Sequence, residues 1–538
     1  MKLNNTLHII FIWLTLVTIG LISRSYFPID ETRYVTVAWN MWLNHDYLVP
    51  YLNGVAYSHK PPMLFWLINL GWAVFGVNDW WPRLVPSLFA LVTVFLTRQL
   101  AARLWPQQHN TSHNAALILL ASGLWVIYST ALMFDMLIAF FTMLGVLGLI
   151  IAYQDRSLKG WLLFTLAIAG GLLAKGPTIL LQLLPVALLA SWWGSKARLS
   201  IKHWYLPILY AVLAGISIAL LWAIPAGIHG GQEYQHAIFW GQTANRMVDS
   251  FAHKRPIWWY LMLLPVLLFP WLLWGAFWKG LLKTVRTQND WGIRLCMAWL
   301  LPVLIAFSFI SGKQVHYILP LFPAFALLIA RVIENTHGSS RSQVLLISLV
   351  TLALGLLLVY LPSHLQSHPN SALWIQTLPQ WLGWLTIALG LAVFALPKAT
   401  QTATVTQLSV FSVSLIVCLM FVVMKSSNGA YDVRPISKKL YDLELQHVPI
   451  AYIGTKYPGI FNFLGRLPQS PEIVPQTEIA DWFAQHPTGR IIALFKGSEK
   501  IDLQQVEFYQ IYRGSSKLTI LNHQQWLTHQ NMQADAVD

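Results

Sequence analysis

Long apolar runs restrict the folds open to this chain more than any other feature. Each run approaches the ~20 residues that an α-helix needs to cross a bilayer. Inside a bilayer every backbone polar group must be satisfied within the protein, which favours helices for runs of this length. The apolar runs occupy residues 7–23, 84–101, 114–131, 136–153, 160–174, 177–194, 204–224, 258–277, 295–311, 315–331, 343–361, 375–396 and 405–424. The sequence therefore predicts a polytopic α-helical membrane protein with about 13 transmembrane helices.

Composition excludes a soluble globular protein. Of the 538 residues 56% are hydrophobic and 10% are charged, whereas soluble domains are about 25% charged. The net charge of +14 is best explained by basic residues that fix the topology and face anionic lipids, so we expect membrane lipids and no nucleic acid as partners. Cys296 and Cys418 both lie in apolar runs and predict buried thiols without a disulfide framework or a metal motif.

The distribution of Lys and Arg predicts how the chain crosses the membrane. No small-residue cleavage site follows the first apolar run, which predicts an uncleaved first span. With the N-terminus inside, the expected inner loops carry a large excess of basic over acidic residues, and the outer segments carry similar numbers of both. An odd number of spans then places the C-terminal tail on the outer side.

Three outer segments are longer than a turn requires, namely residues 24–83, residues 225–257 and the tail from residue 425. Within the first of them, residues 31–44 and 64–76 have helical apolar spacing but are too short or too mixed to span. They predict short helices that lie along the membrane interface. We expect a transmembrane domain over residues 1–424 whose first two outer segments form the functional site.

The tail over residues 425–538 differs in composition from the rest of the chain. Residues 448–454 and 489–495 are typical of buried strands, and residues 479–485 are typical of a helix. The sequence predicts a small α/β domain outside the membrane. No GxGxxG, P-loop or HExxH motif and no internal repeat is present, so nothing in the chain indicates nucleotide chemistry.

Charged residues gather directly after the first apolar run. Asp30 and Glu31 are followed by Arg33 and Tyr34. One interpretation makes Asp30 a general base that faces a cavity at membrane level, oriented by Arg33 and Tyr34. The alternative is that the acidic pair stabilises a helix N-terminus through the helix dipole.

Lys60 lies in the segment Tyr57-Ser58-His59-Lys60-Pro61-Pro62. The two prolines stiffen the backbone and hold Lys60 in a fixed direction. Such a lysine suits the phosphate of a lipid carrier, although a lysine near a membrane also commonly extends its charge to the interface.

Asp135 stands between two apolar runs. An unpaired carboxylate is energetically costly in an apolar setting, so we first interpret Asp135 as a functional residue. The alternative is that Asp135 forms a structural ion pair with Lys60 or Lys175. Otherwise we interpret Lys175 as an interfacial anchor.

The second outer segment and the start of the tenth run supply further candidates. Arg246 is a candidate to complete an anion site with Lys60, as is the run His253-Lys254-Arg255, although Lys254 and Arg255 are better explained as ordinary basic residues beside a membrane. Lys313, His316 and Tyr317 lie at the outer edge of that run. The spacing of His59, His253 and His316 does not by itself predict a metal site.

Together these segments resemble the bacterial lipid A aminoarabinose transferase family and related multi-spanning, polyprenyl-phosphate-dependent glycosyltransferases, which include protein mannosyltransferases. The matching pieces are Asp-Glu-x-Arg-Tyr at 30–34, Leu-Asn-Gly-Val-x-Tyr-x-x-Lys-Pro-Pro at 52–62, Asp135, Ala-Lys-Gly-Pro at 174–177, His253 before Pro-x-Trp-Trp-Tyr, and His-Tyr-Ile-Leu-Pro-Leu-Phe-Pro at 316–323. The resemblance covers residues 20–330 well, and the tail agrees more loosely.

The resemblance implies an enzyme of the bacterial inner membrane with its site and its C-terminal domain in the periplasm. The donor would be an undecaprenyl-phosphate-linked sugar and the acceptor a lipid A-type glycolipid. Lys60 and Arg246 would hold the carrier phosphate, and Asp30 and Asp135 would act around the acceptor and the reacting centre, with inversion. The supporting residues would be Glu31, Arg33, Tyr34, Tyr57, His59, His253 and Tyr317.

The sequence departs from the family pattern at two places, and these departures leave the identity of the sugar and of the acceptor undecided. The residue before Lys60, often acidic in relatives and linked there to a metal near the phosphate, is His59, so the resemblance leaves a divalent metal open and implies no other cofactor. The histidine that some relatives carry shortly before the second-segment arginine is absent from residues 241–244. Transfer to protein or to another glycan is the alternative, and a lipid-linked sugar transporter or flippase is less favoured because no internal repeat is evident.

Overall fold

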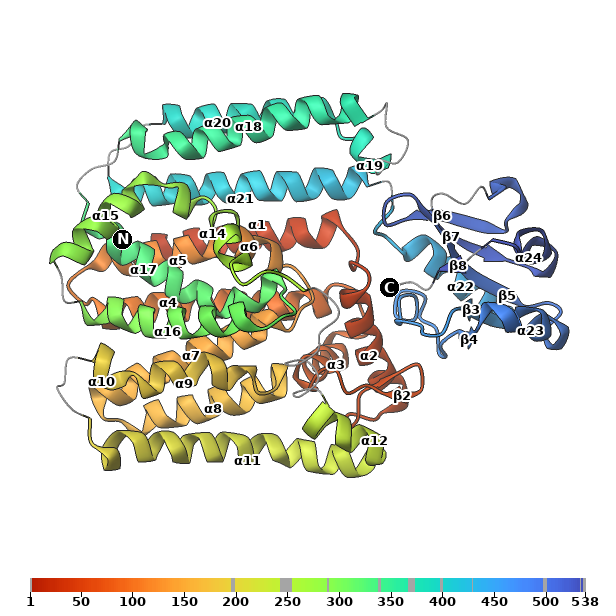
Figure 1. Ribbon diagram of the computed structural model, residues 1–538, viewed down its shortest axis with the longest axis horizontal. Helices are drawn as coiled ribbons and strands as arrows, with labels where there is room; N and C mark the ends of the chain where they lie inside the picture. The colour runs from red at the N-terminus through yellow and green to blue at the C-terminus, as the bar shows by residue number, and fades with distance from the viewer. Residues whose placement is uncertain are drawn as a thin grey trace.

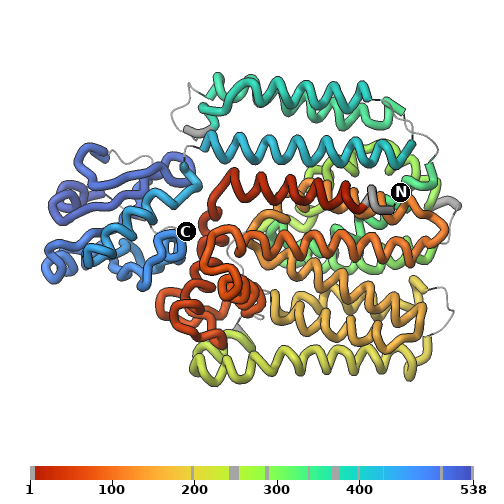
Figure 2. The backbone as a smooth tube through the Cα atoms, turned by 180° about the vertical axis from the view of Figure 1, so that it is seen from behind, coloured from red at the N-terminus to blue at the C-terminus, as the bar shows by residue number. Residues whose placement is uncertain are grey.

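The computed structural model describes residues 2–194, 199–241, 254–287, 290–336, 340–365, 373–396, 400–427, 429–496, 501–532 and 534–535. Long helices run side by side in one bundle, and a sheet domain lies beyond one end of it (Figure 1). Figure 2 shows the same division from behind, with the short helices that follow α1 between the two parts.

Among the described residues, nine segments are long and apolar enough to cross a membrane. Two of these segments consist of a short turn and the helix that follows it. The π-turn η1 (Ile201–Tyr205) leads into α11 (Leu206–His229), and the 3-10 turn η4 (Val315–Leu321) leads into α17 (Phe322–Glu334). The helices are α1 (Lys2–Ser23), α4 (Trp81–Leu104), α7 (Asp135–Asp155), α8 (Leu158–Lys175), α11 (Leu206–His229), α16 (Trp291–Phe309), α17 (Phe322–Glu334), α18 (Arg341–Leu365) and α21 (Gln401–Ser426). The prediction of a multi-pass helical membrane protein is confirmed.

The other four predicted runs form shorter or interrupted helices. Proline contributes to the interruptions because it lacks the N–H that a helix interior needs; Pro185 lies inside α9, Pro265 inside α14, and Pro379 directly before α20. These runs contain α5 (His109–Leu120) with α6 (Gly123–Tyr128), α9 (Thr178–Leu188) with α10 (Ala190–Trp193), α14 (Trp259–Leu267) with η3 (Trp271–Leu273) and α15 (Gly275–Thr287), and α19 (Leu373–Gln376) with α20 (Gln380–Ala395). The count of thirteen spans stays a prediction.

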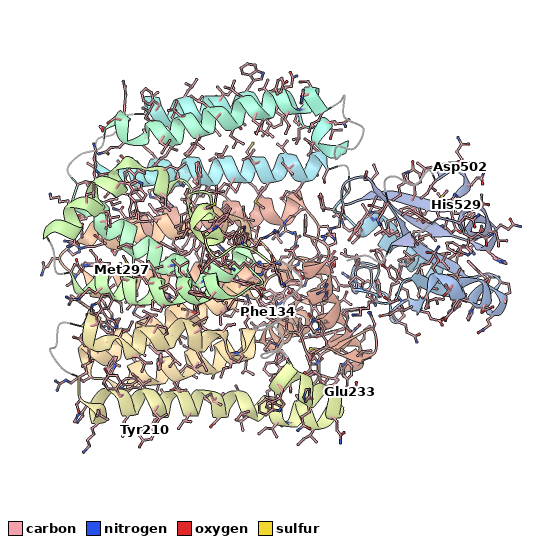
Figure 3. All side chains as sticks on the ribbon, in the orientation of Figure 1. Phe134, Tyr210, Glu233, Met297, Asp502 and His529 are labelled. Carbon is pink, nitrogen blue, oxygen red and sulfur yellow. The ribbon has the colours of Figure 1, made fainter. Side chains whose placement is uncertain are left out.

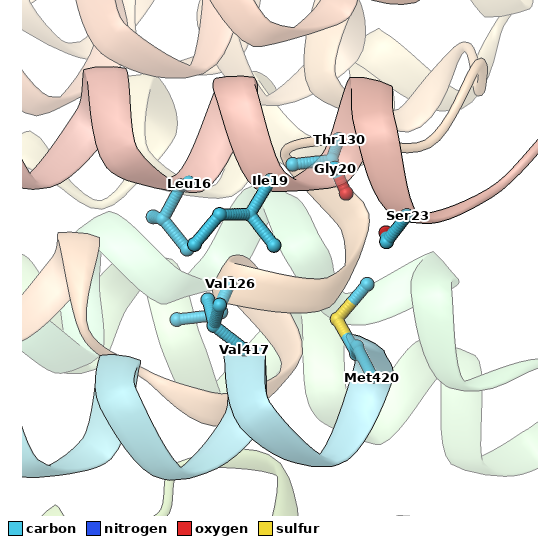
Figure 4. A pocket seen from close by; sticks show the side chains of 8 residues that line it. All are labelled: Leu16, Ile19, Gly20, Ser23, Val126, Thr130, Val417 and Met420. Atoms are coloured by element: carbon cyan, nitrogen blue, oxygen red, sulfur yellow. The ribbon is translucent and has the colours of Figure 1, made fainter. Parts of the chain in front are cut away.

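The bundle is tightly packed beside α1. A small pocket of about 10 Å³ lies between α1, α6 and α21 (Figure 4). That volume suits a single water molecule at most. Its lining is mostly aliphatic: Leu16, Ile19, Gly20, Ser23, Val126, Thr130, Val417 and Met420. It is too small to admit a substrate.

The segment after α1 forms a layer between the bundle and the sheet domain. It contains α2 (Asp30–Asn44), a hairpin of β1 (Tyr51–Leu52) and β2 (Val55–Ala56), and α3 (Met63–Phe75). Asn53 and Gly54 both have positive φ, 55° and 77°, as a tight two-residue hairpin turn requires. The two predicted short helices are confirmed as helices, and their position along the membrane interface stays a prediction. Close to this layer lie α12 (Gly231–His236) and η2 (Ala237–Gly241), which follow α11.

The predicted C-terminal α/β domain is confirmed. Its sheet has the order β4-β3-β5-β7-β6, with β8 also paired to β5; β3 is parallel to β4 and β5, and the other pairs are antiparallel. The elements are α22 (Arg434–Leu445), β3 (Ile450–Ile453), β4 (Glu472–Val474), η5 (Gln476–Glu478), α23 (Ile479–Gln485), β5 (Arg490–Phe495), η6 (Leu503–Gln505), β6 (Phe508–Tyr512), β7 (Ser516–Leu521), α24 (His523–His529) and β8 (Ala534–Asp535).

Alternation along the strands gives this sheet two apolar faces. In β5, Ile492 packs with α22 on one face, whereas Ile491 packs with α23 and α24 on the other. The helices cover both faces, as expected where parallel strands occur in a sheet.

The sheet domain is attached to α2 through the loop between β3 and β4. Thr36 Oγ1 donates to the Gly459 carbonyl at 2.8 Å, and Trp39 Nε1 donates to the Leu467 carbonyl at 3.0 Å. Phe463 from the same loop stacks on Trp72 of α3, with ring centroids 5.1 Å apart. These contacts fix the sheet domain on the layer that contains Asp30 and Lys60.

Candidate active site

The predicted acid Asp135 begins α7 and is 2% exposed. Lys175 ends α8, and its Nζ forms an ion pair with the Asp135 carboxylate. An acid in the first turn and a base in the last turn also suit the two helix dipoles. The predicted ion pair with Lys175 is thereby confirmed, whereas the functional role of Asp135 stays a prediction. The interpretation of Lys175 as an interfacial anchor is wrong, because its side chain is only 12% exposed and is paired with Asp135.

Aromatic rings from two helices pack against Phe134, the residue before Asp135. Phe134 packs edge-on against Tyr34 of α2 at 5.0 Å and against Phe65 of α3 at 5.4 Å between ring centroids. Lys60 Nζ lies 5.7 Å from the Phe134 ring centroid, a cation–π distance. Figure 3 shows Phe134 in the half of the bundle nearest the sheet domain. The rings therefore bring Lys60 to the same end of the bundle as Asp135.

Tyr57 and His59 complete this wall. The ring centroids of Tyr57 and His59 are 5.1 Å apart, and Tyr57 also packs against Phe65. Tyr57 is buried whereas His59 is exposed. The stiff segment before the prolines thus presents His59 outward and Lys60 toward the aromatic wall.

The start of η4 adds His316 and Tyr317 to the site. Lys175 Nζ lies 4.9 Å from the Tyr317 ring centroid. His316 Nδ1 is 3.4 Å from the Tyr128 hydroxyl and is close enough to Asp135, Lys175, Lys60 and Asp30 to interact with all four charges. The structure thus gathers two carboxylates, two lysines and one histidine, as a site for an anionic group with an adjacent base requires.

Asp30 differs from Asp135 in its surroundings. It begins α2 with a side chain that is 55% exposed, and within the described ranges its ion-pair partner is Arg33, whose Nη1 lies 3.8 Å away. No side-chain cap hydrogen bond forms at this helix start, although the acid still suits the dipole. Burial raises the pKa of Tyr34 well above its ordinary value, reinforced by the negative charge of Asp30, so Tyr34 keeps its proton.

Glu31, predicted beside Asp30 as a supporting residue, is buried and fully engaged by the protein. It forms an ion pair with Arg24, and its carboxylate accepts the N–H groups of Phe27 at 2.6 Å and Leu132 at 2.7 Å. Burial alone would raise the pKa of Glu31, but the Arg24 guanidinium holds it below its ordinary value. Because Leu132 lies three residues before Asp135, Glu31 ties the starts of α2 and α7 together.

Two arginines support the same junction. Arg24 also donates to the Thr130 carbonyl at 2.9 Å, and Arg83 donates to the carbonyls of Gly20, Leu21 and Arg24. The carbonyls at the end of α1, which have no partner within the helix, are satisfied in this way.

Some predicted residues lie outside the described residues. Arg246 and His253 fall in the gap between residues 241 and 254. Lys254 and Arg255 are exposed, and the Arg255 carbonyl accepts a hydrogen bond from Lys313 Nζ at 2.9 Å. Over the described ranges no three His, Cys, Asp or Glu side chains group as a metal site, so His59 has no such set of companion ligands there.

Lys175, His316 and Phe134 contribute more to the site than the sequence indicated. A usable signal was present for Lys175, because consecutive spans place the start of one and the end of the next on the same membrane side. Asp135 and Lys175 occupy such positions. No pattern in the sequence indicates that Phe134 would join Lys60 to Tyr34.

The chain is similar to known transferases. A family described as dolichyl-phosphate-mannose-protein mannosyltransferase matches residues 59–222. An undecaprenyl phosphate-alpha-4-amino-4-deoxy-L-arabinose arabinosyl transferase of Pseudomonas fluorescens (strain Pf0-1) is 30% identical over 376 residues, 67% of this chain and 66% of that protein. A relative with the same activity in its name from Pseudomonas aeruginosa (strain LESB58) is 33% identical over 346 residues, 63% and 61% respectively. The match thus spans slightly less than two thirds of each relative.

A solved structure shares the fold. The crystal structure of ArnT from Cupriavidus metallidurans bound to undecaprenyl phosphate superposes with a TM-score of 0.70 at 18% identity, and the match covers 95% of this chain and 97% of that one. The likeness therefore extends over both the helical bundle and the sheet domain.

Proposed function

We propose that the chain belongs to the bacterial lipid A aminoarabinose transferase-like family of polyprenyl-phosphate-dependent membrane glycosyltransferases. In this proposal it transfers a sugar from an undecaprenyl-phosphate-linked donor to a lipid A-type acceptor. The observation that carries this proposal is the gathering of Asp30, Lys60, Asp135 and Lys175 around one aromatic wall. Lysines suit a phosphate, and an acid beside them suits a hydroxyl that must lose a proton.

The reaction is a single displacement at the anomeric carbon of the donor sugar. An acceptor hydroxyl oxygen attacks that carbon, and the bond between it and the phosphate oxygen breaks with inversion. The electron pair of the broken bond leaves with undecaprenyl phosphate. Lys60 and Arg246 oppose the charge that develops on the phosphate, and fixed cations act strongly in a site shielded from water.

We assign the base to Asp30. The Asp135 carboxylate is already engaged by Lys175, whereas the ion-pair partner of Asp30 is 3.8 Å away and the Asp30 side chain is half exposed. Asp30 therefore takes the proton of the acceptor hydroxyl, and Asp135 holds Lys175 in the site. His59 stays a candidate metal ligand from the sequence only. The described residues hold no group of three His, Cys, Asp or Glu side chains that could bind a metal, and no step is assigned to one.

The same proposal covers location. The protein lies in the bacterial inner membrane with about 13 spans, its N-terminus in the cytoplasm, and its site and residues 425–538 in the periplasm. The excess of basic residues in the expected inner loops supports this orientation. Residues 1–424 form the transferase domain, and the outer segments 24–83 and 225–257 contribute the site.

Mass spectrometry of lipid A tests the function. Cells with the intact protein should show lipid A heavier by one sugar, and cells that carry Asp30→Asn or lack the protein should not. Asp30→Asn is the appropriate inactive variant because the Asp30 side chain is half exposed and its ion pair is a long contact of 3.8 Å with Arg33 of the same helix, so we expect the fold to tolerate the change. Unchanged lipid A in cells with membrane-inserted intact protein would exclude this acceptor.

The match to the mannosyltransferase family over residues 59–222 supports a second candidate, transfer to protein or to another glycan. A sugar increment on a protein or another surface glycan, with lipid A unchanged, would select it.

A further inference from the structure

A polar cleft lies between the hairpin layer and the sheet domain, apart from the charged site. Its volume is about 770 Å³, within the range of small-ligand sites. One side is formed by the end of α2 and the β1–β2 hairpin, and the other by residues 468–473 at the start of β4. In Figure 1 the hairpin and the sheet domain lie next to each other, as these shared lining residues require.

The chemistry of the lining restricts the ligand. Four carboxamides line the cleft, from Asn40, Asn44, Asn53 and Gln469. Each carboxamide presents both a donor and an acceptor, which matches a sugar hydroxyl that also donates and accepts. Tyr51 adds an aromatic ring to the lining.

The charges of the cleft exclude an anionic ligand. Asp46 and Glu472 line it, and among the described lining residues there is no Lys or Arg. Asp46 has one basic neighbour outside the lining, His229, whose Nε2 lies 3.7 Å from its carboxylate. Two carboxylates in a lining that holds no Lys or Arg repel a phosphate or sulfate group. An uncharged or amino-bearing saccharide is compatible with the whole lining.

Hydrogen bonds hold several lining residues of the cleft in place. Asn53 at the hairpin tip accepts a hydrogen bond from Ser470 Oγ at 2.9 Å and donates to the Tyr457 carbonyl, so it joins the two sides. Asn40 donates to the Tyr51 carbonyl at 3.2 Å, and Asp46 accepts the N–H of Leu48 at 2.9 Å. The exposed carboxamides of Asn44 and Gln469 are open to a ligand.

Helix α2 connects the cleft to the proposed base. Asp30 begins this helix and Asn40 lies ten residues further on, which corresponds to about 15 Å at 1.5 Å per residue. The hairpin that lines the cleft leads directly into Tyr57 and Lys60. A sugar bound in the cleft is thus too far from Asp30 to be the one that reacts. A longer molecule, however, can occupy the cleft with one part and the charged site with another.

We propose that this cleft binds an uncharged or amino-bearing saccharide portion of the acceptor, several sugar units away from the hydroxyl that reacts. Its identification as part of the acceptor rests on the proposed function, whereas saccharide binding itself does not. Contacts remote from the reacting centre would raise kcat/KM for an extended acceptor over a truncated one.

Binding is tested on the full-length protein in detergent by saturation-transfer NMR, without donor. The probes are maltotetraose, chitotetraose and, as an anionic control, a sulfated tetrasaccharide. The neutral probes should bind and the sulfated one should not. Asn44→Ala with Gln469→Ala should weaken binding about tenfold, as the loss of two hydrogen bonds would. The matched control is Asn110→Ala with Gln504→Ala, which removes an exposed carboxamide of each kind elsewhere and should bind like the wild type.

The outcomes separate this inference from the proposed function. Equal binding of neutral and sulfated probes, or unchanged binding by the cleft variant, would overturn the saccharide cleft. Saccharide binding by a protein that transfers no sugar would leave the cleft standing and refute the proposed function. If transfer occurs, the cleft variant should raise KM for an extended acceptor and leave KM for a truncated acceptor unchanged; equal effects on both would exclude the acceptor role.

Discussion

At the scale of single residues, the buried ion pair between Asp135 and Lys175 stabilises the fold and positions Lys175 in the site. A single substitution at either residue would affect both roles at once. Each charge compensates the other in a site with little water, and the pair also holds Lys175 beside Tyr317. Loss of one partner leaves an uncompensated buried charge, whereas loss of both charges removes the need for compensation.

Lys175→Gln should therefore destabilise the protein by about 3–5 kcal/mol, and Asp135→Asn with Lys175→Gln should recover most of that loss. Neither variant should transfer sugar. Thermal unfolding in detergent measures stability, and product formation measures transfer. Full transfer by the stable double variant would show that the pair serves folding alone.

Glu31 and Asp30 are neighbours with opposite expected phenotypes. Glu31→Gln breaks the buried pair with Arg24 and should cost about 3–5 kcal/mol of stability, because its carboxylate holds the starts of α2 and α7. Asp30→Asn should abolish transfer with the unfolding temperature unchanged. Unfolding curves of the two purified variants decide this, and equal stability losses would refute the division of roles.

The Glu31 pair also predicts a pH dependence. The pKa of Glu31 in the folded protein is held below its ordinary value of 4.5. The unfolded chain therefore binds the proton more readily, so this pair stabilises the fold fully above pH 4.5 and progressively less as the pH falls through the folded pKa. Unfolding temperatures should drop more steeply with acid in the wild type than in Glu31→Gln. Parallel curves would contradict the assignment.

At the scale of elements, the loop between β3 and β4 joins the two parts of the protein. Gly459 has φ of +73°, and a Cβ there would lie 2.6 Å from Leu52 Cδ1 and 3.1 Å from Thr36 Cγ2. Its carbonyl also accepts the Thr36 hydroxyl. The position needs glycine for both its backbone and its close approach to α2.

Gly459→Ala should loosen this contact and reduce transfer, with increased hydrogen exchange in the β1–β2 hairpin. The matched control is Gly514→Ala, which has φ of +94° but no heavy atom within 4 Å of a built Cβ. The control carries similar backbone strain, about 1–3 kcal/mol, without the clash. If both variants lose transfer equally, backbone strain rather than docking is responsible.

At the scale of the whole molecule, the layer between bundle and sheet domain places the charged site and the polar cleft at the same end of the bundle. Helix α7 begins in the site at Asp135, so the turn after Asp155 lies at the other end of the bundle. The proposed orientation places that turn in the cytoplasm.

Cysteine labelling tests this orientation. In a background without Cys296 and Cys418, Gln504→Cys in the sheet domain should react with a membrane-impermeant maleimide in cells with a permeabilised outer membrane. Lys159→Cys after α7 should react only once the inner membrane is also opened. The reverse pattern would invert the topology.

Long-range pairing limited what the sequence could predict. The long helices, the two short helices α2 and α3 and the α/β tail follow from local apolar patterns, which depend on neighbouring residues only. The role of Glu31 depends on Leu132, a hundred residues away, and the cleft depends on Asn53 meeting Ser470. Such contacts are set by the packing of distant elements. Asp30, Lys60 and Asp135 were predicted as candidates, and Lys175 as one of two alternative partners of Asp135, whereas the choice between Lys60 and Lys175 and the role of Phe134 required the structure.

Turnover of an undecaprenyl-phosphate-linked sugar by the purified full-length protein tests the proposed chemistry most directly. With a lipid A acceptor, mass spectrometry should show free undecaprenyl phosphate and acceptor heavier by one sugar in equal amounts, and Asp30→Asn should produce neither. An intact donor after incubation of the folded wild-type protein with lipid A, other glycans and protein acceptors would contradict the proposed transferase activity.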